Sequence, residues 1–152
     1  MPQLVWYNNT DGKGTFSKQF NLPANNLFQF NHAVGDLNND GYVDVVISAG
    51  RIRSQLLAWF NNTDGNGNFS KPIVIHSTLL PNQLSPVAVG ANQVAIADFN
   101  NDGNMDLLYS LAMNNITTRP TTYYSQIQLY NNIAGNGNFS KSKQDDLNNY
   151  TI

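Results

Sequence analysis

The sequence predicts an all-β protein assembled from repeated four-stranded antiparallel units. Three observations support this fold class. One turn-containing motif recurs three times, an Asp-rich loop recurs twice, and the composition favours turns over helix interiors. Asn-Gly, Asp-Gly and Asn-Asn steps are frequent, and these pairs adopt turn conformations more readily than helical ones. We therefore expect strands joined by tight loops and no helix.

The composition bounds what the protein can be. A chain of 152 residues is long enough for one domain with a core, so a single domain is expected. All ten acidic residues are Asp, and six of them fall within the two Asp-rich loops, so the negative charge is concentrated there. The absence of cysteine excludes disulfides, zinc-thiolate sites and cysteine nucleophiles. Rigidity would have to come from another source, and a bound metal would supply it.

Nucleic acid and membranes are not expected partners. The eight Lys and Arg residues are scattered along the chain and form no basic stripe that would neutralise phosphates. The sequence contains no run of 18 apolar residues, and its first twenty residues lack a basic segment followed by an apolar one. Neither membrane insertion nor a signal peptide is predicted.

The first repeated motif predicts a β-hairpin. It reads WYNNTDGKGTFSK at 6–18, WFNNTDGNGNFSK at 59–71 and LYNNIAGNGNFSK at 129–141. Each copy begins with a β-rich run that ends at an Asn pair, continues through a Gly-containing turn and resumes at Phe16, Phe69 or Phe139. Each copy is therefore interpreted as two short strands joined by a tight turn.

The second motif alternates with the first. DLNNDGYVD at 36–44 and DFNNDGNMD at 98–106 lie between the hairpins, and apolar strand-like runs enter and leave both loops. Each unit thus has four strands, joined in order by the Asp-rich loop, a link and the hairpin turn. This is the size of a propeller blade, so a β-propeller-like repeat is expected. The predicted boundaries are an extra hairpin at 3–22, a blade at 27–75, a second blade at 87–143 and a tail at 144–152.

The Asp-rich loops have the donor pattern of a hard-cation site. Side-chain oxygens recur at loop positions 1, 3, 5 and 9, a glycine follows at position 6, and a main-chain carbonyl is expected at position 7. Carboxylate and amide oxygens suit calcium better than zinc or copper, which prefer nitrogen and sulfur. We predict two Ca²⁺ sites, with ligands Asp36, Asn38, Asp40, Tyr42 and Asp44 in the first loop, and Asp98, Asn100, Asp102, Asn104 and Asp106 in the second.

The loops allow two other interpretations, an EF-hand and a plain acidic turn. An EF-hand needs a bidentate Glu at position 12 and flanking helices, whereas position 12 is Ile47 or Tyr109 here. A plain acidic turn would explain one copy on its own. Two copies that agree at six of nine positions in the same strand context favour the metal site.

The order of these elements resembles the FG-GAP or VCBS repeats, from about Gln3 to Lys143. It consists of a strand, a DxNxDGxxD loop, an apolar strand and a hairpin with the pattern W-[YF]-N-N-x-x-G-x-G-x-F. These repeats form the calcium-loaded β-propellers of integrin α-subunits, some mushroom lectins and many surface proteins. The resemblance implies that the Asp and Asn residues of the loops bind calcium. It also implies a role in extracellular or cell-surface adhesion, carbohydrate binding or surface architecture.

The copy number departs from that family, because closed propellers typically have about four to eight blades. Two full units and one extra hairpin leave strand edges and apolar faces that need a cover. Either the chain is part of a longer propeller, or neighbouring copies stack or pair to continue the array. The two ends are not equivalent, and head-to-tail contact that does not close gives a filament. Copies of the chain itself are therefore the expected partners, with glycans or cell-surface proteins as further candidates.

Sequons of the form Asn-x-Ser/Thr predict glycosylation, at Asn8, Asn61, Asn68, Asn115, Asn138 and Asn149. The repeated aromatic positions allow two interpretations, packing between units or a sugar-stacking platform, and they are Trp6, Tyr7, Trp59, Phe60 and Tyr130. A lectin is the alternative function, and its pocket is expected near the insertions at 76–93 or 111–125. No acid, base and nucleophile set stands out, so we predict a structural or adhesive protein and not an enzyme.

Overall fold

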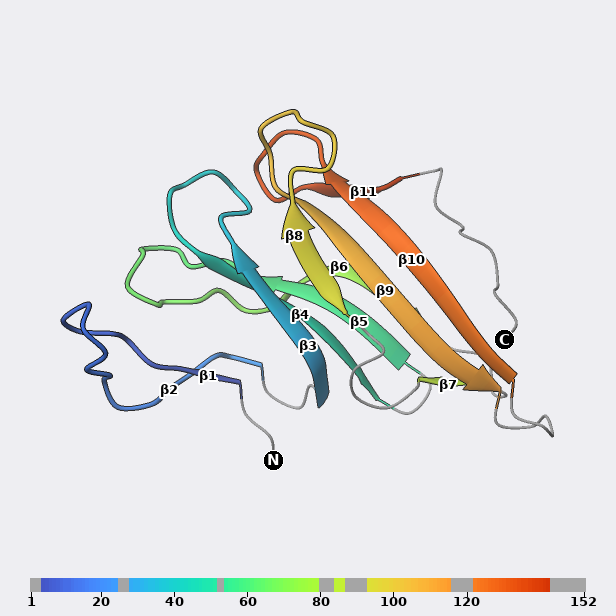
Figure 1. The fold of residues 1–152 in the computed structure, drawn as a ribbon, viewed down its shortest axis with the longest axis horizontal. Coiled ribbons are helices and arrows are strands. Elements are labelled where there is room, and N and C mark those ends of the chain that lie inside the picture. Colours follow the sequence, from blue (N-terminus) through green and yellow to red (C-terminus); the bar gives the residue numbers. More distant parts are fainter. Residues whose placement is uncertain are drawn as a thin grey trace.

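The computed structural model describes residues 4–24, 28–51, 54–79, 84–86, 93–115 and 122–142. All regular elements in these residues are β-strands, and every strand pairing is antiparallel. The predicted all-β class is thus confirmed. The strands form three sheets, and Figure 1 shows them in chain order, with the blue hairpin at one end and the orange strands at the other.

The N-terminal hairpin consists of β1 (Val5–Trp6) and β2 (Phe20–Asn21). An isolated bridge between Asn9 and Phe16 closes its turn. Next to this bridge, Ser17 and Asn8 are joined by one backbone bond and one side-chain bond in place of the two backbone bonds of a regular strand pair. The Ser17 N–H donates to the Asn8 carbonyl (2.8 Å), and its Oγ accepts the Asn8 N–H (2.9 Å). The second strand therefore begins later than the expected start at Phe16.

The central sheet has the order β3-β4-β5-β6. Its strands are β3 (Phe28–Gly35), β4 (Asp44–Arg51), β5 (Ser54–Phe60) and β6 (Ile73–Leu79). The first Asp-rich loop joins β3 to β4, where Gly35 pairs with Asp44, and the second hairpin turn joins β5 to β6. This is the four-stranded unit that the sequence predicted, although β6 continues to Leu79, past the expected boundary at residue 75.

The C-terminal sheet repeats this arrangement with an interrupted first strand. Its strands are β7 (Leu84–Pro86), β8 (Val94–Ala97), β9 (Asp106–Asn115), β10 (Thr122–Asn132) and β11 (Phe139–Lys141). Both β7 and β8 pair with β9, at its far and near ends, so together they occupy the place of β3. The expected start of this unit at residue 87 therefore lies after β7.

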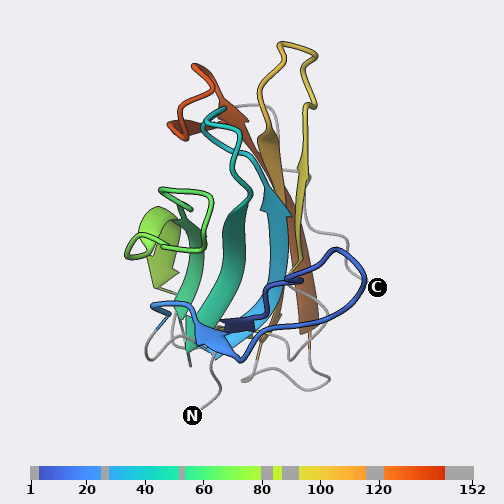
Figure 2. The same ribbon diagram turned by 90° about the vertical axis from the view of Figure 1, so that its left-hand side faces the viewer.

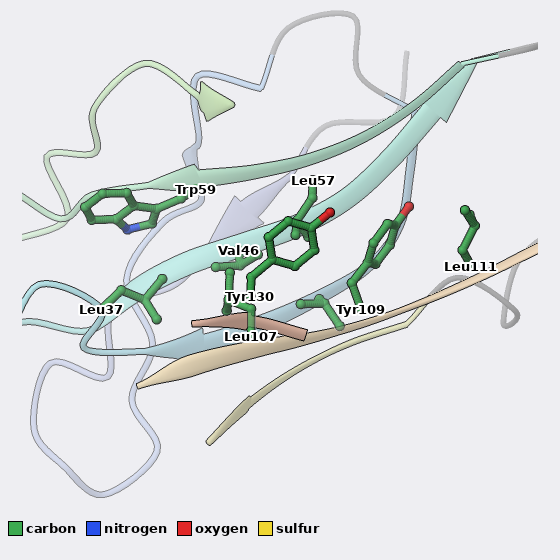
Figure 3. Packing of buried hydrophobic residues seen from close by; sticks show 9 residues of the cluster. Leu37, Val46, Leu57, Trp59, Leu107, Tyr109, Leu111 and Tyr130 are labelled. Atoms are coloured by element: carbon green, nitrogen blue, oxygen red, sulfur yellow. The ribbon is translucent and has the colours of Figure 1, made fainter. Parts of the chain in front are cut away.

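The core lies between the sheets. One cluster joins Leu37, Val46, Leu57 and Trp59 of the central unit to Val94, Leu107, Tyr109, Leu111 and Tyr130 of the C-terminal unit, and Figure 3 shows the two tyrosines between the facing strands. A second cluster covers the opposite face of the central sheet with residues of the N-terminal hairpin segment. The inner strands β4 and β5 thus contribute buried residues to a cluster on each face of the central sheet, and Figure 2 shows the N-terminal hairpin in front of this sheet. Successive units stack face to face, which is how a repeat array buries its apolar surfaces.

Candidate metal centre

The first Asp-rich loop is held in shape by its own first residue. The Asp36 carboxylate accepts hydrogen bonds from the backbone N–H groups of Asp40 (3.2 Å) and Gly41 (2.9 Å). Two residues of the loop have left-handed backbone conformations, Asn39 at φ 57° and Gly41 at φ 85°. Asn and Gly tolerate this region better than other residues, which explains why Asn-Asp-Gly specifies the turn.

The second loop repeats the first bond for bond. The Asp98 carboxylate accepts the N–H groups of Asp102 (3.1 Å) and Gly103 (2.9 Å). Asn101 and Gly103 have φ values of 59° and 86°. The two loops differ in sequence at three of nine positions, and the shared residues are those that fix the backbone.

Positions 3, 5 and 7 form a chain of short-range bonds. Asn38 Nδ2 donates to Asp40 Oδ2 (2.8 Å), and Asp40 Oδ1 accepts the N–H of Tyr42 (2.8 Å). The second loop has the same two bonds, from Asn100 Nδ2 to Asp102 Oδ2 (3.0 Å) and from the Asn104 N–H to Asp102 Oδ1 (2.8 Å). The Asn104 N–H contributes most to holding the pKa of Asp102 below its ordinary value. Asp40 and Asp102 are exposed at the loop surface.

The Asp at position 9 is different, because it is fully buried and joins the loop to the next hairpin. Asp44 Oδ2 accepts the N–H of Leu37 (3.1 Å), and its Oδ1 accepts the N–H of Asn62 (2.8 Å). Burial raises the pKa of Asp44, against the effect of these two N–H donors. Asp106 makes the equivalent bonds to the N–H groups of Phe99 (3.1 Å) and Asn132 (2.9 Å).

The second Asn of each hairpin motif completes this junction. In the C-terminal unit, Asn132 Nδ2 donates to the carbonyls of Leu37 (2.7 Å) and Met105 (3.2 Å), and its Oδ1 accepts the N–H of Gly137 (3.1 Å). Asn62 likewise bridges the Val43 carbonyl (3.2 Å) and the Gly67 N–H (3.1 Å). These roles of Asn62 and Asn132 were not predicted from the sequence, although the Asn pair that recurs in all three motifs was a signal.

The two loops also contact each other. Asn39 Nδ2 of the first loop donates to Asn104 Oδ1 of the second (2.9 Å), and the Asn132 bond to Leu37 links the third hairpin to the first loop. Gly135 fits between these elements, because a Cβ at this position would overlap the amides of Asn39 and Asn104. The two Asp-rich loops and the third hairpin turn therefore lie in contact at the same end of the strands (Figure 1).

The loops contain the oxygen ligands that a calcium site needs, and the carboxylates among them accept hydrogen bonds from backbone N–H groups. Within the described ranges, no group of three or more His, Cys, Asp or Glu side chains is gathered as a metal-binding cluster. The carboxylates of both loops instead accept loop N–H groups. Each carboxylate oxygen has a further lone pair, so these bonds and cation ligation are chemically compatible. Three carboxylates and one amide per loop fit a hard cation, and calcium binding stays a prediction.

The sequons differ in accessibility. Asn8, Asn68 and Asn138 are exposed on the hairpin turns. Asn61 is only partly exposed, and its Oδ1 is buried with no hydrogen-bond partner among the described residues. The side chain of Asn115 and all of Asn149 lie outside the described residues. Glycosylation stays a prediction at all six positions.

The repeated aromatic residues mainly pack in the core. Trp59, Phe60 and Tyr130 are buried, and Trp6 is partly buried against the central sheet. Tyr7 is the exposed member of this set. A sugar-stacking platform needs exposed ring faces, so these positions support the packing interpretation. Large parts of the two insertions suggested for a lectin pocket lie outside the described residues.

Asp64, in the second hairpin turn, provides a test by pH titration. N–H donation from the Asn66 backbone, and then from the Asn68 side chain, lowers the pKa of Asp64 below 3.8. Its contribution to stability is therefore present above pH 3.8 and is lost as the pH falls through the lower folded-state pKa. In an NMR titration, Asn68→Ala should move the Asp64 midpoint back towards 3.8. A midpoint that is unchanged in this variant would contradict the assignment.

A family model described as an FG-GAP-like repeat matches the chain twice, over residues 2–47 and 36–109. Together these matches cover more than half of the chain. The chain belongs to the FG-GAP-like repeat family. Searches of curated proteins and of solved structures gave no match.

The FG-GAP matches include the first two hairpins and both Asp-rich loops. The third hairpin lies beyond them, and its relation to the FG-GAP repeats rests on the internal repeat and on the shared Asn–Phe pairing that closes its turn. FG-GAP repeats are typical of extracellular or surface proteins. Across the described residues, no helix is long and apolar enough to span a membrane.

Proposed function

We propose that this FG-GAP protein is a non-catalytic structural or adhesive module that calcium makes rigid and that works outside the cell or at its surface. The observation that carries the proposal is the pair of matching Asp-rich loops, each attached to the next hairpin by a buried carboxylate. An ion held by a loop would strengthen the attachment of two strands and one turn at once. The proposal therefore assigns calcium a structural role.

The function also includes assembly. Blades in a propeller-like arrangement would continue into copies of the chain, and glycans on the exposed turns would leave the stacked sheet faces free. The stacking of three successive sheets supports this part of the proposal. It is consistent with a chain that extends an array by adding units at its ends.

Calcium is expected to raise the thermal unfolding midpoint. A site at about 100 times its Kd stabilises the folded state by about 2.7 kcal/mol. At about 2–4 °C per kcal/mol for a chain of this size, each site should add roughly 5–10 °C. Differential scanning calorimetry in calcium and then in a chelator measures this shift.

Matched variants separate loop binding from a general effect of charge. Asp40→Asn together with Asp102→Asn removes one carboxylate from each loop and should abolish most of the shift. Asp64→Asn removes a partly exposed carboxylate from a hairpin turn and should keep the shift. A wild-type midpoint that is the same in calcium and in chelator would overturn the calcium part of the proposal.

A further inference from the structure

A tryptophan from each of the first two hairpins packs on the next hairpin turn. Trp6 lies against Gly67, and Trp59 lies against Gly137, so closely that a Cβ on either glycine would overlap the indole. The same tryptophans make edge-to-face contacts with the following phenylalanines. Trp6 and Phe69 have ring centroids 6.3 Å apart at 75°, and Trp59 and Phe139 are 6.4 Å apart at 84°. This contact therefore repeats from unit to unit.

The first hairpin has the receiving side of this contact without a tryptophan on it. Gly14 is equivalent to Gly67 and Gly137, and no described atom lies within 4 Å of a Cβ built there. Phe16 is equivalent to Phe69 and Phe139, and it is 63% exposed. Tyr7, which corresponds to the buried Phe60 and Tyr130, is 50% exposed. One face of the N-terminal hairpin is thus an uncovered copy of a buried surface.

The outer face of the C-terminal sheet is the complementary surface, and it is partly exposed in the part of the chain that the structure describes. In the central sheet, Val46 pairs with Trp59 and Ser48 pairs with Leu57, and all four residues are buried. Val46, Leu57 and Trp59 belong to the cluster shared with the C-terminal sheet. The equivalent pairs of the C-terminal sheet are Leu108 with Leu129 and Ser110 with Ile127. Ile127 is 39% exposed, and the other three residues are partly exposed.

We propose that this outer face, defined by Leu108, Ile127 and Leu129, binds the N-terminal hairpin of a second copy of the chain. Leu129 takes the position of the tryptophan and lies on Gly14 and Phe16 of that copy. The two surfaces are at opposite ends of the stack (Figure 1), so the contact is head-to-tail and each added copy exposes a new free end. This inference rests on the proposed assembly and specifies its interface.

The interface inside the chain supports the choice of occupant. Face-to-face stacking of hairpin on central sheet, and of central sheet on C-terminal sheet, uses the same sequence positions each time. To stack a further unit on the C-terminal sheet in the same way requires a hairpin whose turn glycine has space beside it and whose phenylalanine is exposed. Gly14 and Phe16 of the N-terminal hairpin meet both requirements. Leu129 fills less of that space than a tryptophan, so the contact between copies should be weaker than the contacts within one chain.

A larger side chain at position 129 should strengthen the association between copies, and this can be measured. Sedimentation velocity over a range of concentrations should show reversible association of the wild-type chain. Leu129→Trp should strengthen the association constant by about tenfold, because it restores the indole on Gly14 and the ring contact with Phe16. Phe16→Asp should weaken it by at least about tenfold. Val74→Trp, on an exposed position of β6, is the matched control and should leave it unchanged.

A cross-link tests the register. The chain has no cysteine, so Lys13→Cys and Leu129→Cys variants can be mixed without background thiols. A disulfide dimer should form from this mixture and not from Lys13→Cys mixed with Val74→Cys. Association without this cross-link, or with no response to Leu129→Trp and Phe16→Asp, would overturn the proposed interface and leave the assembly in place. A wild-type chain that stays monomeric at every concentration would overturn the interface and the assembly together.

Discussion

Replacing Asn132 with alanine is expected to lower the free energy of unfolding by on the order of 3 kcal/mol. The Asn132 side chain is fully buried and bonds to two carbonyls and one N–H, which belong to Leu37, Met105 and Gly137. Alanine would leave these backbone groups without the partner that Asn132 provides, and the bond to the Leu37 carbonyl is buried. Urea unfolding of the variant and the wild type at constant calcium concentration measures the difference.

Asn9 provides the matched control. It has the same place in the N-terminal hairpin, but it is exposed, and its side chain makes one bond, to the Gly14 N–H (3.2 Å). Asn9→Ala should therefore change stability by less than about 1 kcal/mol. Equal losses for the two variants would show that the Asn acts only within its own turn and would contradict its role as a junction between loop and hairpin.

Gly137→Ala should destabilise the protein by about 3 kcal/mol, from two separate causes. Gly137 has φ 76°, and a residue with a Cβ loses about 1–2 kcal/mol in that conformation. The added Cβ would also overlap the Trp59 indole, and forced overpacking costs about 1–3 kcal/mol. Denaturant unfolding measures the total, and tryptophan fluorescence reports whether the Trp59 ring has moved.

Gly14→Ala separates the two causes. Gly14 occupies the same turn position at φ 96°, and it has open space where the indole would be. Only the backbone term, about 1–2 kcal/mol, should remain. If both variants lost the same stability, the contact of Trp59 with Gly137 would contribute nothing, and the repeated contact on which the proposed interface depends would lose its support.

The local conformations were accessible from the sequence because they depend on neighbouring residues. The Asn-Asp-Gly steps predicted the two loop turns, and the structure has left-handed residues at Asn39, Gly41, Asn101 and Gly103. The apolar runs on either side predicted β3, β4, β8 and β9. Strand boundaries were less accurate near Ser17 and Ser70, because their hydroxyl groups replace ladder bonds with Asn8 and Asn61.

The donor set of the loops was also a local property. Carboxylates and amides at alternating positions identified a chemistry that suits calcium, and hydrogen bonding around Asp36 and Asp98 shows that each loop is closed by its first residue. The different behaviour of Asp44 was not accessible in this way. Its burial comes from the packing of the next hairpin, and its bond to the Asn62 N–H spans 18 residues.

The sequence by itself determined the repeats, the all-β class, the family and the oxygen donors of the loops, since each is set by residues that are close together along the chain. Only the tertiary structure decided which copy of a repeated residue is buried. Asn9, Asn62 and Asn132 have nearly the same local sequence, yet Asn9 is exposed and Asn132 bonds to a residue 95 positions away. Tyr7 and Phe60 differ in the same way. Such similar motifs have similar local preferences, so the burial of each copy depends on whether another unit lies against it.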